Sequence, residues 1–261
     1  HNRTHSFPTR RSSDLFKKAE DFSEGLAWVL PDEEGNYNNH GVINTSGQMV
    51  IAPGEFSNFK AFSCGMAKVE LRKANGYHFI DKSGKIVLSD YSSAESFSFD
   101  RALVKKDNQE FFIDKAGNRL FKDKNYYYIE AFSDGLAVVR IKDNNSSLPP
   151  YAFIDTSGEV VIDMRKSGIK NYGQPQRFSE GLAAVKYRIK DYEYGIAFIN
   201  KSGKVAFDIG DRFSEAYPFS DGMAAVKERA SEKWGYVNKS GQVVLPPIYS
   251  KNIDSFYEGR A

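Results

Sequence analysis

The chain has 261 residues, with 36 lysines and arginines against 34 aspartates and glutamates, for a formal net charge of +2. A charge balance so close to zero gives no electrostatic case for nucleic acid or an anionic membrane as a partner. The sequence also lacks an apolar run long enough to span a membrane as a helix. Its one cysteine, Cys64, excludes an internal disulfide framework.

Residues 1–15 share neither period nor composition with the remainder of the chain. Residues 6–15 back-translate without a gap into a string that resembles a common sequencing adapter read in frame. The Arg10-Arg11 pair is followed by charged rather than apolar residues, so a signal peptide is not indicated. We therefore expect residues 1–15 to be an unstructured, non-native leader and the true N-terminus to be missing. Without this leader the net charge is zero.

Residues 16–261 form a tandem repeat array. A six-residue pattern recurs in it: phenylalanine, serine, an acidic residue, glycine, an aliphatic residue and alanine. The spacing between copies runs from 35 to 46 residues, the third copy is degraded and the seventh is truncated by the end of the chain. The copies begin at Phe22, Phe62, Phe97, Phe132, Phe178, Phe219 and Phe256.

Each repeat has a second fixed element, a quartet of Asp or Asn, Lys or Thr, Ser or Ala, and Gly, preceded by an aromatic or β-branched pair. This pattern predicts a hairpin turn whose last residue has positive φ. A third strand follows the first glycine, so each unit is predicted to be a three-stranded antiparallel meander. An aromatic residue also recurs six positions before the next copy. Positive φ is expected at Gly25, Gly65, Gly135, Gly181 and Gly222, at the hairpin glycines Gly47, Gly84, Gly117, Gly158, Gly203 and Gly241, and at Asp100, which replaces the glycine of the degraded copy.

Alanine and valine recur two residues apart in the third strand, whereas the residue between them varies from tryptophan to lysine. Only a buried face forces such a pattern, so we expect the Ala/Val pairs and the repeat phenylalanines to share one continuous interior. The buried set is Ala27/Val29, Ala67/Val69, Ala102/Val104, Ala137/Val139, Ala183/Val185, Ala224/Val226, Phe62, Phe132, Phe178 and Phe219. The positions expected to face outward or half inward are Trp28, Lys68, Leu103, Val138, Ala184 and Ala225.

A single meander cannot bury its apolar face alone, so neighbouring repeats must stack. The fold class predicted is all-β, as an open, superhelical, solenoid-like array of meanders. The alternative is a β-propeller, whose blades carry four strands. Three recognisable strands per unit and uneven spacings favour the open array.

These residues resemble the bacterial WG-repeat family. Residues 234–241, which begin with Trp234-Gly235 and end at Gly241, are the copy most similar to it, and a Val-Val-Leu-Pro-Pro run follows. The Trp-Gly pair occurs in one unit only. The corresponding pairs elsewhere are His40-Gly41, Tyr77-His78, Glu110-Phe111, Tyr151-Ala152 and Ile196-Ala197. The resemblance implies an all-β repeat architecture and leaves the chemistry open.

Catalytic and metal-binding patterns are poorly represented. The histidines do not cluster with paired spacing, and Cys64 has no nearby histidine, so we expect no catalytic residue, cofactor or metal. The acidic residue of each copy could form a stripe for calcium or for a basic partner. A solvated turn residue is the simpler interpretation, because one carboxylate per repeat makes a poor oxygen cage. The acidic positions are Glu24, Asp134, Glu180 and Asp221.

Variation in loop length points to a binding edge, because insertions in stacked repeats fall on one face. The long insertions are residues 30–41, 141–151 and 187–195, and they are rich in tyrosine, which suits protein or carbohydrate ligands. Tolerated drift of loop length is the alternative explanation. The candidate binding residues are Tyr37, Tyr151, Tyr187, Tyr192 and Tyr194.

The function predicted is therefore a non-enzymatic bacterial repeat module that binds protein or surface glycan, or that serves as a structural spacer. The alternative is a targeting array of a larger enzyme whose catalytic domain lies outside this sequence. Neither nucleic acid nor membrane insertion is expected. Cytoplasmic and exported locations both fit the sequence.

Overall fold

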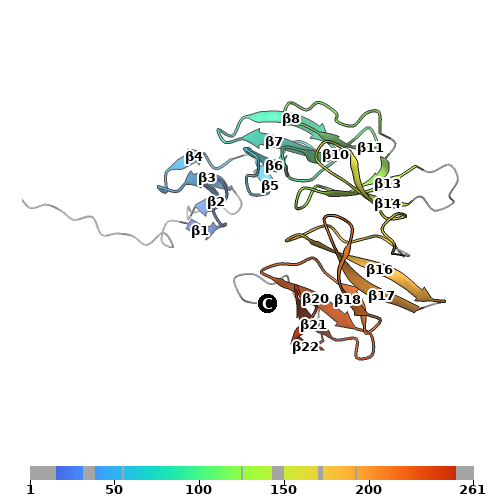
Figure 1. Ribbon diagram of the computed structural model, residues 1–261. Coiled ribbons are helices and arrows are strands. Elements are labelled where there is room, and N and C mark those ends of the chain that lie inside the picture. The colour runs from blue at the N-terminus through green and yellow to red at the C-terminus, as the bar shows by residue number, and fades with distance from the viewer. Residues whose placement is uncertain are drawn as a thin grey trace, which may run out of the picture. The chain divides into compact units, whose positions relative to one another are not determined.

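The computed structural model describes residues 16–31, 39–54, 56–124, 126–142, 150–169, 173–191 and 193–250. Over these residues the protein consists of strands joined by turns, and Figure 1 shows no helix among them. The expected leader and the last repeat copy lie outside the described residues. The chain forms two compact units, His1–Leu120 and Phe121–Ala261, each of which is described by itself.

The first unit contains three antiparallel sheets. The first sheet has the order β1 (Phe16–Ala19), β2 (Leu26–Pro31), β3 (Gly41–Asn44) and β4 (Met49–Ile51). The second has the order β5 (Phe56–Phe59), β6 (Met66–Leu71), β7 (Tyr77–Asp81) and β8 (Ile86–Tyr91). In the third, β10 (Ala102–Lys106) lies between β11 (Gln109–Ile113) and β9 (Ser93–Ala94).

The second unit also contains three antiparallel sheets. The first has the order β12 (Tyr126–Ile129), β13 (Ala137–Ile141), β14 (Tyr151–Ile154) and β15 (Val160–Asp163). The next consists of β16 (Leu182–Lys190), β17 (Glu193–Asn200) and β18 (Val205–Gly210). The last has the order β19 (Phe213–Ala216), β20 (Met223–Glu228), β21 (Trp234–Asn238) and β22 (Val243–Tyr249).

The prediction of an all-β chain of tandem antiparallel meanders is confirmed, and no sheet of the described residues closes into a barrel. The strand count is corrected, because four of the six sheets have four strands. The additional strand begins at the aromatic residue that recurs six positions before each copy. Phe56 pairs with Leu71, and Phe213 pairs with Glu228. This strand is short and contains a bulge, so it lacks the alternation by which a strand is recognised in a sequence.

Two turns shape every repeat, and their sequences explain their geometry. In the first copy, the N–H groups of Ser23 and Leu26 donate to each other's carbonyls at 2.8 and 3.0 Å, and both residues between them have positive φ, 51° at Glu24 and 81° at Gly25. This is a two-residue hairpin turn whose second position glycine adopts without strain. The expectation of positive φ is confirmed at all eleven glycines and at Asp100, whose φ is 60°.

The Ala/Val pairs are buried as predicted, with every member at most 2% exposed, and the four repeat phenylalanines are buried with them. They do not form one continuous interior, however. Separate apolar clusters lie between successive sheets, for example one around Phe178 with Phe153 of the preceding sheet, and another around Phe219 with Phe198. The core is therefore divided among the junctions between repeats, as expected of a stacked array.

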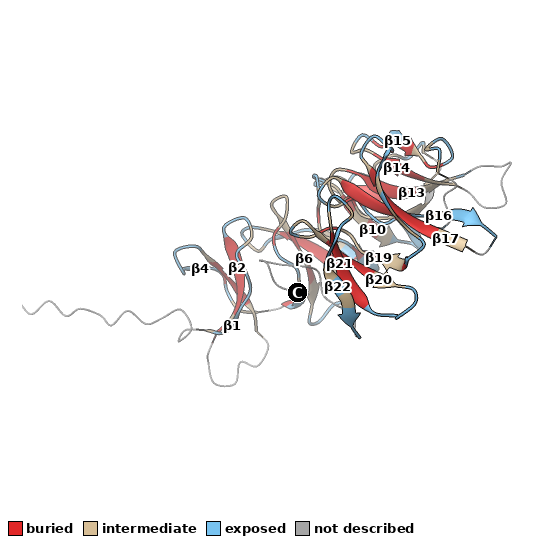
Figure 2. Cartoon of the chain, turned by 60° about the horizontal axis from the view of Figure 1, so that its bottom comes forward, coloured by how far each residue is buried: buried red, intermediate tan, exposed pale blue. Residues whose placement is uncertain are grey.

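The positions expected to face outward or half inward are buried in four of six repeats, which contradicts the prediction. Trp28, Val138, Ala184 and Ala225 are buried, whereas Lys68 and Leu103 are half-buried. The two faces of β16 show why. Ala183 and Val185 pack against the preceding sheet, and Ala184 packs against the following one. A stacked sheet is covered on both faces, so much of each central strand is buried while outer strands such as β4 and β22 stay largely exposed (Figure 2).

Candidate functional site

The tyrosines predicted as a binding edge are not assembled into one surface. Tyr37 and Tyr192 lie outside the described residues. Tyr151 is half-buried at the start of β14, where its ring meets Tyr128 edge-on at 6.1 Å and Arg140 lies 4.4 Å from its centroid. Its contacts are therefore with neighbouring side chains of its own sheet.

Tyr187 and Tyr194 belong to the long β16–β17 hairpin but lie on opposite faces of it, because Tyr187 pairs with Gly195 and Tyr194 pairs with Arg188. The Tyr187 ring covers Gly195, where an added Cβ would come within 2.6 Å of the ring. Its hydroxyl donates to Asp208 at 2.5 Å, and burial together with this carboxylate raises the pKa of Tyr187 to about 12. Binding at these tyrosines stays a prediction.

A groove of about 660 Å³ opens in the second unit. One wall is the outer strand β15 and the turn after it, and the other is the turn between β17 and β18 of the next sheet. The two walls touch, because a Cβ added at Gly203 would lie 2.9 Å from the Ile162 side chain. Aliphatic and cationic residues share the lining, chiefly Val160, Val161, Arg165, Lys166, Ser202 and Lys204.

The cations of the groove differ in their partners. The Arg165 guanidinium is held by Asp163, with Nη2 at 2.6 Å and Nε at 3.0 Å from the two carboxylate oxygens. This hydrogen-bonded pairing holds the pKa of the Asp163 carboxyl below its ordinary value. Within the described residues Lys166 and Lys204 make no ion pair, and both are exposed. The described lining of the groove therefore combines two lysines that have no ion pair with an exposed aliphatic strand.

The sequence interpretation missed this groove. The Phe132-to-Phe178 spacing of 46 residues is the longest in the chain. We assigned its extra length to residues 141–151, but the residues after β15 add to it as well. The Arg165-Lys166 pair in that second insertion is the feature of the sequence that could have indicated a cationic groove.

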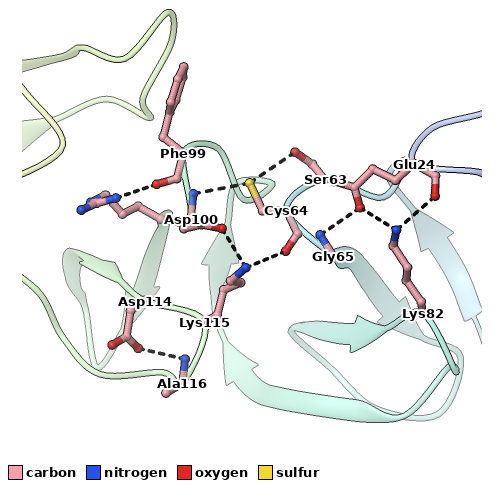
Figure 3. A network of polar contacts seen from close by, with 11 residues as sticks. Glu24, Ser63, Cys64, Gly65, Lys82, Phe99, Asp100, Asp114, Lys115 and Ala116 are labelled. Carbon is pink, nitrogen blue, oxygen red and sulfur yellow. Dashed lines mark hydrogen bonds and ion pairs between the residues drawn. The ribbon is translucent and has the colours of Figure 1, made fainter.

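The acidic residues of the repeat turns also have a role that differs from the prediction. Glu24 accepts a hydrogen bond from the Gly65 N–H at 2.9 Å and lies 3.3 Å from the Lys82 ammonium, both in the next repeat (Figure 3). Burial raises the pKa of Glu24, but the Gly65 and Lys82 contacts outweigh burial and hold the pKa below its ordinary value. Glu24 thus joins two repeats, although it is exposed to solvent.

The same contact recurs at both junctions of the second unit, and we call this set the inter-repeat ladder. The donor glycine N–H and the lysine ammonium of the following repeat lie at 2.6 and 2.7 Å from Asp134 and at 3.0 and 2.9 Å from Glu180. The glycines are Gly181 and Gly222, and the lysines are Lys201 and Lys239. Since Lys201 lies in the β17–β18 turn, the ladder also anchors one wall of the groove.

Cys64 occupies the acidic position in the second copy. Its thiol accepts a hydrogen bond from the Asp100 N–H at 3.4 Å, and Lys115 pairs with Asp100 at 2.8 Å instead (Figure 3). Cys64 is half-buried. It therefore retains the contact with the following repeat but supplies no negative charge.

We expect Asp134→Asn to lower the free energy of unfolding by about 1 kcal/mol, because it removes the charge from one hydrogen bond and one ion pair. Asparagine tolerates the φ of 53° at this position, so the backbone is preserved. Urea denaturation of the chain, with hydrogen exchange in β16–β18, measures the loss. Asp221→Asn is the matched control, since the exposed Asp221 has no ladder partner among the described residues. Equal losses in the two variants would contradict the ladder.

The ranges that the structure describes contain no helix able to cross a membrane. Within the same ranges no group of His, Cys, Asp and Glu side chains is arranged to hold a metal ion. Of the two histidines that the structure describes, His40 packs on Phe59 at 4.6 Å and His78 is buried within β7.

The solved structures that match this chain share little sequence with it. A eukaryotic initiation factor has 11% identity and a TM-score of 0.47, over 85% of this chain and 62% of that chain, so this chain spans less than two thirds of its length. Hsv2 of Kluyveromyces lactis has 10% identity and a TM-score of 0.42, over 84% of this chain and 73% of that one. A protein of unknown function from Bacteroides caccae has 15% identity and a TM-score of 0.34, over 80% and 89%.

No curated protein matches the chain. A family model, described as the WG containing repeat, matches most of it, at residues 15–30, 41–73, 79–109, 111–145, 189–229 and 234–261. These matches include five of the six Ala/Val strands and the Trp234-Gly235 pair, whereas residues 146–188, with the fifth copy, lie outside them. The chain therefore belongs to the WG-repeat family.

Proposed function

We propose that this chain is a non-enzymatic repeat module that binds a protein or glycan ligand in the groove of its second unit. The observation that carries the proposal is the combination, in one groove of about 660 Å³, of an exposed aliphatic strand and two unpaired lysines. Ligand sites commonly have this volume and combine apolar surface with a few polar groups.

The rigidity of the groove walls supports binding. β15 belongs to a four-stranded sheet, and the opposing turn is held through Gly203 against Ile162 and through Lys201 by Asp134. A ligand that enters such a site orders few protein groups, so less of the interaction free energy is lost to conformational entropy on binding.

The chemistry of the lining supports a non-enzymatic role. Asp163 is the one carboxylate among the described lining residues, and Arg165 holds it ionised through a bidentate pairing. A general acid or base needs a pKa near the working pH and a free position beside the substrate. Asp163 is suited to orienting Arg165 instead. A targeting array of a larger enzyme would use the same groove for the same purpose.

Filling the groove tests the proposal. Val161→Tyr adds a ring at an exposed position of the β15 wall, and Val244→Tyr adds it at the corresponding position of the last repeat, outside the groove lining. Both variants and the parent chain are titrated with a panel of labelled peptides and oligosaccharides, and recovered ligands are examined by mass spectrometry. We expect Val161→Tyr to weaken binding by about tenfold and Val244→Tyr to leave it within about twofold.

Three outcomes would count against the proposal. If no panel member binds, the chain is a spacer. If both tyrosine variants weaken binding equally, the ligand binds elsewhere. If a bound ligand is recovered chemically altered, the chain is an enzyme.

A further inference from the structure

The wall of the groove formed by β15 is the edge of a sheet. β15 is the last strand in the order β12-β13-β14-β15, and no strand of the described residues pairs with its outer side. Val160 and Val161 stand on this edge strand with 39% and 46% of their surface exposed. An edge strand with exposed aliphatic side chains can accept another extended segment, whose backbone pairs with the strand while its alternate side chains cover the valines.

The groove also carries cationic side chains. Lys166 and Lys204 approach it from its two walls, and neither pairs with a carboxylate of the described residues. Arg165 adds a third cation, which Asp163 neutralises. The described residues of the lining thus carry a net charge of two positive units from Lys166 and Lys204, although residues 16–261 together are neutral. Local charge of one sign attracts and orients a ligand of the other sign.

We propose that the groove binds an extended acidic protein segment that carries aliphatic side chains. This inference rests on the proposed binding function and names the class of its ligand. Among the described residues of the lining there is no aromatic ring on which a sugar could stack. A pleated strand flanked by lysines matches a peptide whose aliphatic and acidic residues alternate, since side chains at this period lie on opposite sides of an extended backbone.

The test uses the whole chain and fluorescent peptides of equal length in which valine alternates with aspartate, serine or lysine, together with a sulfated oligosaccharide. Fluorescence anisotropy gives the dissociation constants at two salt concentrations. We expect the aspartate peptide to bind about tenfold more tightly than the serine peptide and the lysine peptide to bind weakest. The preference should shrink at high salt, because exposed lysines are screened.

Reversing the charge of the two groove lysines tests whether the acidic peptide binds at the groove. The double variant Lys166→Glu/Lys204→Glu should weaken binding of the aspartate peptide by at least about tenfold. The control Lys186→Glu/Lys233→Glu changes the net charge equally, at exposed lysines that do not line the groove, and should leave binding within about twofold. If the charge-reversed variant folds poorly, Lys166→Gln/Lys204→Gln provides the same test, because it removes the two positive charges without introducing negative charges that repel the aspartate peptide.

The outcomes separate this inference from the proposed function. Equal binding of aspartate and serine peptides, or equal losses in the groove and control variants, overturns the acidic class while the groove remains a binding site. Tight groove binding of the oligosaccharide without the peptides overturns the peptide class. Absence of all binding overturns both proposals.

Discussion

Replacing Phe178 by alanine is expected to cost about 3–5 kcal/mol of unfolding free energy, the largest effect of any single change considered. Phe178 is 0% exposed, and its ring packs edge-on to Phe153 of the preceding sheet at 4.8 Å. The cluster around it includes Met164 and Val185, which cannot close over the lost ring without moving two sheets. The bond from the Ser133 hydroxyl to the Phe178 carbonyl involves the backbone and is retained, so the loss reports packing.

Phe22→Ala is the matched control for this change. Phe22 begins the same six-residue sequence as Phe178, but its surface is 52% exposed, so its removal should alter stability by no more than about 0.5 kcal/mol. Hydrogen exchange followed by mass spectrometry measures both variants. Protection in Phe178→Ala should fall first in β12–β18, because repeats are coupled to their neighbours. A uniform loss over the whole chain, or a loss in Phe22→Ala of similar size, would refute the stacked core.

Gly235→Ala is expected to destabilise the last sheet by about 3 kcal/mol, at the upper end of the usual cost of overpacking. An added Cβ would lie 2.5 Å from the Leu245 carbonyl oxygen and 2.9 Å from backbone atoms of Pro246 and Pro247. Backbone cannot rotate away as a side chain does, so β22 must shift. Gly41 has a similar constraint, with the Ile51 carbonyl oxygen 2.8 Å from its added Cβ. Because the glycine of the Trp-Gly pair has no side chain, it leaves room for the backbone of the fourth strand.

Gly54→Ala provides the comparison for this glycine. Its added Cβ would meet only the Ala52 carbonyl oxygen, at 3.8 Å, and its φ is not positive. Thermal unfolding should show no loss for Gly54→Ala beyond about 0.5 kcal/mol. Hydrogen exchange in β21 and β22 should rise in Gly235→Ala alone. Full protection of β22 in that variant would show that the strand can move aside at no cost.

The parts of the fold that could be predicted are those encoded over a few residues. Asp81, for example, accepts hydrogen bonds from the Ser83 and Lys85 N–H groups at 2.9 and 3.1 Å, so the turn is specified by its own sequence. The Ala/Val alternation likewise identified one buried face of the strands. The fourth strand escaped prediction because its pairing, such as Phe56 with Leu71, is interrupted by a bulge.

The candidate site was less predictable than the fold. Tyrosine-rich insertions indicated a binding edge, yet Tyr187 uses its hydroxyl on Asp208 within its own sheet. The groove depends instead on Lys166 and Lys204, which are 38 positions apart in the sequence and line one groove only when two sheets stack. Nothing local to either lysine distinguishes it from other exposed lysines.

Two segments of the chain, residues 22–27 and 178–183, have the identical sequence Phe-Ser-Glu-Gly-Leu-Ala. Comparing them shows which features the sequence determined by itself and which the tertiary structure determined. Both copies form the same turn, with φ of 51° at Glu24 and at Glu180, because turn geometry depends on neighbouring residues alone. Phe178 is buried and Phe22 is exposed, because a sheet with Phe153 precedes the one and no described repeat precedes the other. Burial of the second face, the partners of the ladder carboxylates and the groove all arise in the same way, from surfaces that meet only when repeats stack.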